Sequence, residues 1–260
     1  MLTTSAAYGA ITSRLERSLA QKSAEKPVAL ETDYYLKNID GVKSIDDLLG
    51  DTRLFKYAMK AFGLEEMAHA KAFMRKILTE GVDDGQSFAN RLNDDRFLEF
   101  AKVFNFARDG AAATGTAEAR QGVVDRYVRQ ALEVSAGEDN EGVRLALYFQ
   151  REAPKVSSVY GLLSDAALWK VVKTVFGFPD GMAAASIEKQ AASVSKRLDI
   201  ASLRDPEKLE HLITRFTAAW DATELATQDP VLSLFGATSP TATADLELIM
   251  TLKNLKHGGA

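Results

Sequence analysis

The sequence predicts an all-α protein in which duplicated helix-turn-helix units pack as a helical bundle, with amphipathic helices at both ends. Apolar residues recur at helical spacing through most of the 260 residues, and no alternating pattern typical of strands competes with them. One long stretch of sequence also occurs twice. These two observations predict the fold class.

The repeated stretch covers residues 34–64 and 148–178, which align without a gap. Ten of the 31 aligned positions are identical: Tyr34/Tyr148, Val42/Val156, Ser44/Ser158, Leu48/Leu162, Leu49/Leu163, Asp51/Asp165, Leu54/Leu168, Lys56/Lys170, Phe62/Phe176 and Gly63/Gly177. Two fainter copies follow at 92–106 and 203–216. We therefore interpret 30–225 as a duplicated helical body, with halves at about 34–146 and 148–225.

An N-terminal helical arm is expected at 1–29, where Ile11, Leu15 and Leu19 form a narrow apolar seam. In the first repeat, Ser44 can cap a short helix that runs to about Leu49. Asp51 is the expected N-cap of the next helix, and Gly63 is expected to end that helix in the left-handed conformation.

The other copies are expected to use the same devices. Asp165 and Gly177 correspond to Asp51 and Gly63, and Asp205 precedes a proline and an acid, which a helix N-terminus favours. Asn105 is predicted to end its helix as Gly63 does, after a cap at Asn93 or Asp94. Further helices are predicted around 123–132 and at 143–152, the latter after an Asp139/Asn140 cap.

The C-terminal segment 226–260 is predicted to hold a linker, 226–244, and an amphipathic helix. Leu246, Ile249, Met250 and Leu255 give that helix a broad apolar face. The terminal helices either dock on protein partners or on another copy of the chain, or fold back and complete the core.

Composition excludes several classes of function. The absence of cysteine rules out disulfides and thiolate chemistry. A net charge of -4 without a basic cluster argues against nucleic-acid binding. No apolar run approaches the roughly 20 residues of a membrane span, and no signal peptide is recognisable, so we expect a cytoplasmic protein, or one exported by a dedicated secretion system.

Glu66 and His69 are the candidate metal ligands. Their Glu-x-x-His spacing places a carboxylate and an imidazole on one helix face, as in di-iron bundles. Such a site needs a second motif, but Lys208 replaces the glutamate beside His211, and Ala183 stands where the repeat would place a second histidine. A surface histidine is the competing interpretation.

No catalytic residue and no cofactor are predicted. The acid pairs at 46–47, 83–84 and 94–95 fit helix starts better than calcium ligands, because the sequence around them lacks the ligand spacing of a calcium loop. Phosphate-binding loops and nucleophile elbows are absent. A small-ligand sensor with a pocket between the two halves stays open as an alternative to a metal-binding enzyme.

Several blocks resemble a bacterial family of domain-of-unknown-function proteins whose genes commonly lie among flagellar genes. They are ALETDYYLKNI, DTRLFKYAMKAFGLEEMAHAKAFMRKILTEGV, SFANRLND, NEGVRLALYFQR and RFTAAWD, spread over residues 30–221. The resemblance implies no established activity and no catalytic residues. It implies a non-catalytic part in flagellar assembly, structure or motility, through flagellar protein partners.

Overall fold

The computed structural model describes residues 2–92 and 94–228. Within these ranges the chain forms helices and turns and no β-strand, so the predicted all-α class is confirmed. The predicted linker and C-terminal helix lie outside the described residues, except that 226–228 belong to the last described helix.

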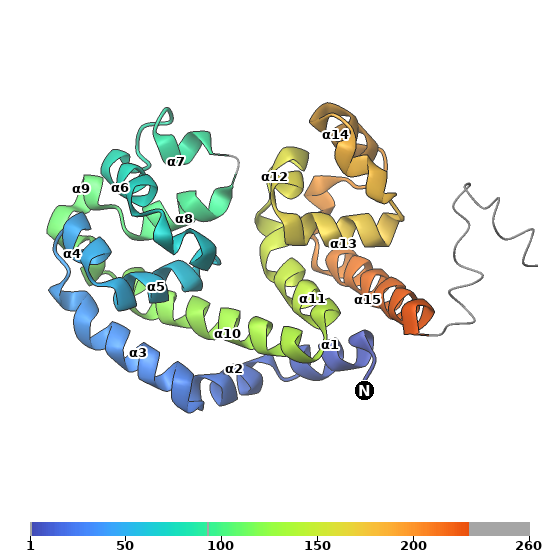
Figure 1. The fold of residues 1–260 in the computed structure, drawn as a ribbon, viewed down its shortest axis with the longest axis horizontal. Coiled ribbons are helices and arrows are strands. Elements are labelled where there is room, and N and C mark those ends of the chain that lie inside the picture. The colour runs from blue at the N-terminus through green and yellow to red at the C-terminus, as the bar shows by residue number, and fades with distance from the viewer. Residues whose placement is uncertain (1, 93, 229–260) are drawn as a thin grey trace, which may run out of the picture.

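The helices divide between two lobes and a connecting layer (Figure 1). The N-terminal helices are α1 (Thr4–Thr12), α2 (Leu15–Ala24) and α3 (Lys26–Asn38). The first lobe continues with η1 (Ile39–Gly41), α4 (Ile45–Gly50), α5 (Thr52–Ala61), η2 (Glu65–His69), α6 (Lys71–Glu80), α7 (Phe88–Arg91), α8 (Asp95–Val103), α9 (Phe106–Asp109), η3 (Gly110–Gly115) and η4 (Glu118–Gly122). The long α10 (Val123–Asp139) follows. The second lobe contains α11 (Glu141–Glu152), η5 (Ala153–Lys155), α12 (Val159–Ser164), α13 (Ala166–Phe176), η6 (Asp180–Ala184), α14 (Ile187–Ser195), η7 (Ile200–Arg204) and α15 (Pro206–Gln228).

The first lobe has its own apolar core, drawn from residues between Val28 and Val128. Three tyrosines from three helices stack inside it. The rings of Tyr35 and Tyr57 lie 4.6 Å apart and those of Tyr57 and Tyr127 lie 3.8 Å apart, centroid to centroid. These contacts join α3, α5 and α10.

The second lobe has a separate core, formed by Tyr8 and by residues between Val143 and Phe216. Helices α11, α13 and α15 pack against one another around it. The N-terminal helix belongs to this lobe in space: Tyr8 donates a hydrogen bond to Glu210 at 3.0 Å, and the amide of Thr4 donates one to Asp221 at 2.8 Å. The N-terminal helix therefore lies folded against α15.

Helix α10 connects the two lobes. Its first turns contribute Val123, Val124, Tyr127 and Val128 to the first core, and Ala136 packs against the second. Asn140 then caps α11, with its side chain accepting from the amide of Gly142 at 2.8 Å. The two lobes thus stand side by side on a layer formed by α10 and the N-terminal helices (Figure 1).

The two strong repeats end their main helices in the same way. Gly63 and Gly177 have φ angles of +68° and +60°. The amide that follows each glycine donates back to the preceding turn, from Leu64 to Met59 at 2.8 Å and from Phe178 to Lys173 at 3.0 Å. This is the hydrogen bonding of a Schellman motif.

Two expectations from the sequence are wrong. Asn105 does not adopt the left-handed conformation: its φ is -78°, and its side chain accepts from the amide of Arg108 at the start of α9. Asn105 therefore caps the start of α9 and does not act as the left-handed terminator of α8. The predicted first helix is also divided, because Arg14 leaves the helical conformation between α1 and α2.

Candidate functional site

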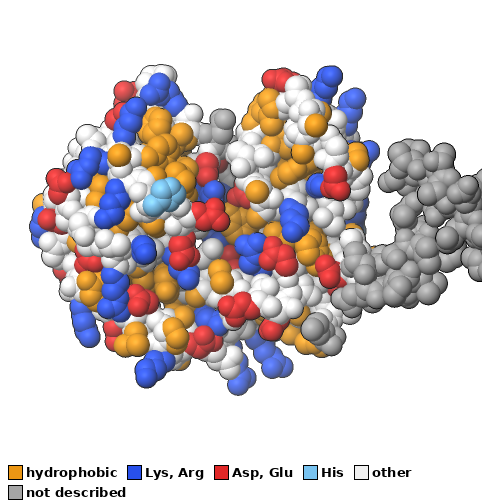
Figure 2. Space-filling model, viewed as in Figure 1, with side chains coloured by type: hydrophobic (Ala, Val, Ile, Leu, Met, Phe, Trp, Pro, Cys, Tyr) orange, Lys and Arg blue, Asp and Glu red, His pale blue; other side chains and the backbone are white. Residues whose placement is uncertain are grey.

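A cleft lies between the two lobes. A cavity of about 450 Å³ opens on it, lined from the first lobe by Glu66 and Arg96 and from the second by Tyr148, Asp165 and Lys170. A smaller cavity of about 50 Å³ shares Arg96, Tyr148 and Asp165 with it. Figure 2 shows the hollow between the lobes, with acidic and basic side chains alternating where they meet.

Tyr148 and Asp165 form one wall of this cleft. The Asp165 Oδ1 caps α13 by accepting from the amides of Ala167 and Leu168 at 2.9 and 3.0 Å, and Oδ2 accepts from the Tyr148 hydroxyl at 2.6 Å. Burial, and then the charge of Asp165, raise the pKa of Tyr148 above its ordinary value. The phenol is therefore held as a neutral donor, which suits a structural role.

Arg96 approaches the same wall from α8 of the first lobe. Its guanidinium donates to the Asp94 carboxylate at 2.7 to 3.1 Å and to the carbonyl of Gly63 at 2.8 Å. Burial acts to lower the pKa of Arg96, but the hydrogen bond and charge of Asp94 outweigh it and raise the pKa. All three nitrogens of this guanidinium are thus engaged within the first lobe.

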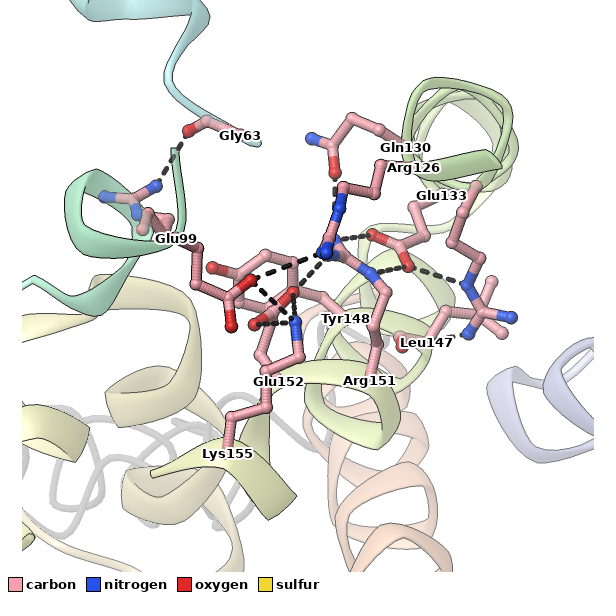
Figure 3. A network of polar contacts seen from close by, with 12 residues as sticks. Gly63, Glu99, Arg126, Gln130, Glu133, Leu147, Tyr148, Arg151, Glu152 and Lys155 are labelled. Atoms are coloured by element: carbon pink, nitrogen blue, oxygen red, sulfur yellow. Dashed lines mark hydrogen bonds and ion pairs between the residues drawn. The ribbon is translucent and has the colours of Figure 1, made fainter. Parts of the chain in front are cut away.

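A buried carboxylate lies beneath the cleft. The side chain of Glu133, on α10, is 1% exposed and accepts from Nε of Arg129 at 2.9 Å and from two nitrogens of Arg151 at 2.8 Å (Figure 3). Arg151 also donates to Gln130 at 3.0 Å and pairs with Glu152. The ion pairs join α10 to α11 without leaving the buried charge uncompensated.

Further ion pairs connect the lobes. Glu99, on α8, lies 3.3 Å from Arg126 and 3.6 Å from Lys155, and Lys155 lies 3.0 Å from Glu152 (Figure 3). Helices α8 and α10 are thereby linked to the end of α11 and to η5. These pairs are part-exposed, so each contributes little to stability. They do restrict the position of one lobe relative to the other.

The candidate metal ligands lie at the edge of the cleft. Glu66 and His69 are both exposed on the five-residue 3₁₀-helix η2, and Glu66 lines the larger cavity. Within the described residues, no cluster of three or more histidine, aspartate or glutamate side chains could hold a metal ion. The di-iron interpretation therefore has no supporting ligand set in this part of the chain.

The residues expected as caps lie at helix ends. Asp51 accepts from the amides of Arg53 and Leu54 at 3.1 and 3.0 Å, and Asp205 accepts from that of Glu207 at 3.0 Å. Asp94 accepts from the amide of Arg96 at 3.0 Å. Of the residues expected as caps, Asp165 and Gly63 also line the larger cavity.

Sequence reasoning did not single out Arg96, Glu133 or Arg151. Glu133 and Arg151 come from different helices, and Arg96 also bonds the carbonyl of Gly63 in another segment of the first lobe. No motif marks such contacts. One indication was present: the stretch GVRLALYFQRE carries arginines beside an otherwise apolar helix, and its Tyr148 aligns with Tyr34 in the repeat.

None of the helices in the described ranges is both long and apolar enough to cross a membrane.

The chain is similar to a protein family of unknown function and to a solved structure. A family model described as "Protein of unknown function (DUF1217)" matches residues 61–209. The crystal structure of protein AGR_C_984 from Agrobacterium tumefaciens is similar, with a TM-score of 0.78 and 48% sequence identity. The match covers 85% of this chain and 96% of that one. No curated protein matches the chain significantly.

Proposed function

The chain belongs to the DUF1217 family of proteins of unknown function, and we propose that it is a non-catalytic helical protein that acts by binding another protein. We assign the binding to the cleft between the lobes. The setting we propose is flagellar assembly, structure or motility.

The single observation that carries this proposal is the cleft itself. It is open, its larger cavity measures about 450 Å³, and both lobes contribute to its lining. The exposed Val134 on α10 lies in this lining next to charged side chains. An open groove of mixed polarity, with an exposed apolar side chain, suits a polypeptide segment.

The chemistry of the cleft supports recognition rather than catalysis. Its most buried charges are satisfied by one another: Glu133 by Arg129 and Arg151, and Arg96 by Asp94. Burial, together with the charge of Asp165 and the hydrogen bond to it, raises the pKa of Tyr148 and keeps the phenol neutral. Groups engaged in this way are poorly placed to exchange protons with a substrate.

The flagellar setting rests on the resemblance of the sequence blocks to a bacterial family whose genes commonly lie among flagellar genes. It is an association by gene neighbourhood, and the partner we expect is therefore a component of the flagellar apparatus.

The test combines a deletion with affinity capture from motile cells. Deleting the gene should impair flagellation or swimming, and the tagged wild-type chain should recover a flagellar protein. The variant Val134→Lys, which places a charge in the cleft, should lose that protein.

The matched control is Ile187→Lys on α14. Val134 and Ile187 are both β-branched and similarly exposed, at 37% and 44%, but only Val134 lines the cleft. Capture should survive in Ile187→Lys. Normal swimming after deletion, together with no flagellar protein recovered by the wild-type chain, would overturn the proposal.

A small-ligand sensor is the second candidate, and the cavity volume favours it. Pockets for small ligands measure roughly 300 to 1,000 Å³, a range that includes this cavity. A metabolite that raises the melting temperature of the wild-type chain and not that of Val134→Lys would support this function over protein binding.

A further inference from the structure

The two repeats differ at the position that faces their shared Tyr–Asp pair. In the first half, Tyr34 donates to Asp51 at 2.8 Å, and the guanidinium carbon of Arg53 lies 4.0 Å from the centre of the Tyr34 ring. Arg53 donates to both oxygens of Glu31, at 2.9 and 3.0 Å. An arginine on an aromatic face, paired with a carboxylate, thus covers this Tyr–Asp pair.

The second half keeps the Tyr–Asp pair but lacks the arginine and its partner. In the gapless alignment Arg53 corresponds to Ala167, and the same register, continued three residues upstream of the aligned stretch, pairs Glu31 with Leu145. Ala167, Leu145 and Tyr148 all line the cavity of about 450 Å³. The cavity therefore lies where the first repeat places the Arg53–Glu31 ion pair.

No side chain of the first lobe takes the place of that arginine. Arg96 reaches this wall, but its three nitrogens are occupied by Asp94 and by the carbonyl of Gly63. Arg151 lies 5.2 Å from the Tyr148 ring, but it is held by Glu133 and does not line the larger cavity. The cavity beside Ala167 stays open.

The charge of the lining favours a cation. The larger cavity is lined by five carboxylates and three cationic side chains. In the described part of the chain, Glu66 makes no hydrogen bond or ion pair, and it faces this cavity from the first lobe. This carboxylate lines the same cavity as Ala167 and supplies the partner that Leu145 cannot.

We propose that the cavity between the lobes receives an arginine side chain of the partner polypeptide, in the place that Arg53 occupies in the first repeat. This inference rests on the proposed function and names the group that is recognised. The guanidinium would lie beside Ala167 and Tyr148 and pair with Glu66. A planar guanidinium suits the site better than an ammonium because it stacks on apolar and aromatic surfaces while donating in its own plane.

The test titrates the full chain with the capped peptide Gly-Arg-Gly and follows the backbone amide signals by NMR. Saturable shifts are expected at Ala166, Ala167 and Lys170. The same peptide with citrulline in place of arginine keeps the shape and removes the charge, and its affinity should fall about tenfold. Glu66→Gln, at an exposed position, should weaken arginine binding without affecting folding.

Ala167→Arg supplies the missing side chain from within the protein and should abolish peptide binding. The matched control is Ala192→Arg, at an exposed position of α14 outside the cavity, which should bind as the wild type does. The absence of saturable binding to the wild-type chain would overturn the inference, and so would equal binding to the wild type and to folded Ala167→Arg.

Two further results separate this inference from the proposed function. A flagellar partner captured equally by the wild type and by Ala167→Arg would leave the proposed function standing and refute the arginine site. Free arginine that binds more than tenfold tighter than the peptide, with no protein captured, would refute protein binding and the assignment to a polypeptide.

Discussion

The hydroxyl of Tyr148 donates a 2.6 Å hydrogen bond to Asp165, and the same bond joins Tyr34 to Asp51 in the first repeat at 2.8 Å. In both copies the aspartate also caps the helix that follows it. The tyrosine therefore ties one α-helix to the start of the second α-helix after it, and this unit is what the duplication preserves.

The two capping aspartates should differ in their contribution to stability. Asp51→Ala should lower the free energy of unfolding by about 1 kcal/mol through loss of an N-cap. Asp165→Ala should cost about 2 kcal/mol, because it also leaves the hydroxyl of the more deeply buried Tyr148 without its acceptor. Urea unfolding of both variants measures the difference.

Equal costs for the two variants would show that the deeper burial of Tyr148 adds nothing to the cost of losing its acceptor. A loss of function in Asp51→Ala with unchanged stability would contradict the structural role of that residue.

Much of the local structure could be predicted because its causes are local. A capping aspartate and the amides that it accepts from lie within three residues, and a left-handed glycine ends a helix through bonds to the preceding turn. The helical spacing of apolar residues likewise predicts the fold class. Asn105 shows the limit: its sequence context fits a terminator, but its side chain is used to cap α9.

The cleft could not be predicted for the opposite reason. Glu133 and Arg151 are 18 residues apart on different helices, and Glu99 and Lys155 belong to different lobes. Such contacts depend on how α10 and α11 cross, which no spacing in the sequence encodes. The alignment of the repeats does show that Ala167 stands where the first repeat has Arg53. The consequence of this difference, however, is seen only once the structure shows the cavity beside Ala167.

Glu133 should be among the most sensitive charged residues of the chain. Glu133→Gln should lower the free energy of unfolding by about 3 kcal/mol, because Arg129 would then be buried without a counter-charge and Arg151 would keep only Glu152. Denaturant unfolding measures this loss.

The control is Glu141→Gln, which breaks a part-exposed pair with Arg144 within α11. That change should cost less than about 1 kcal/mol. A similar cost for both variants would mean that burial adds nothing to the Glu133 network.

Tyr148 should make stability fall at alkaline pH. Burial and Asp165 raise the pKa of its phenol above the ordinary value of 10. Above about pH 10 the unfolded chain therefore releases a proton that the folded chain retains, so the free energy of unfolding decreases as the pH rises. Urea unfolding between pH 9 and 11 should give a shallower decrease in Tyr148→Phe than in the wild type. Parallel decreases in the two proteins would contradict this assignment.

Gly142 should tolerate no side chain, because α11 approaches α15 closely at this residue. A Cβ on Gly142 would lie 2.5 Å from Cδ1 and 2.7 Å from Nε1 of the Trp220 ring, well inside van der Waals contact. Gly142→Ala should therefore force the two helices apart and cost about 1 to 3 kcal/mol.

Gly9→Ala is the matched control. Gly9 is a helical glycine of α1 with no atom within 4 Å of the added Cβ, so alanine should stabilise the chain by about 0.5 to 1 kcal/mol. Thermal unfolding of the two variants should thus shift in opposite directions, and a stabilised Gly142→Ala would refute the close packing of α11 on Trp220.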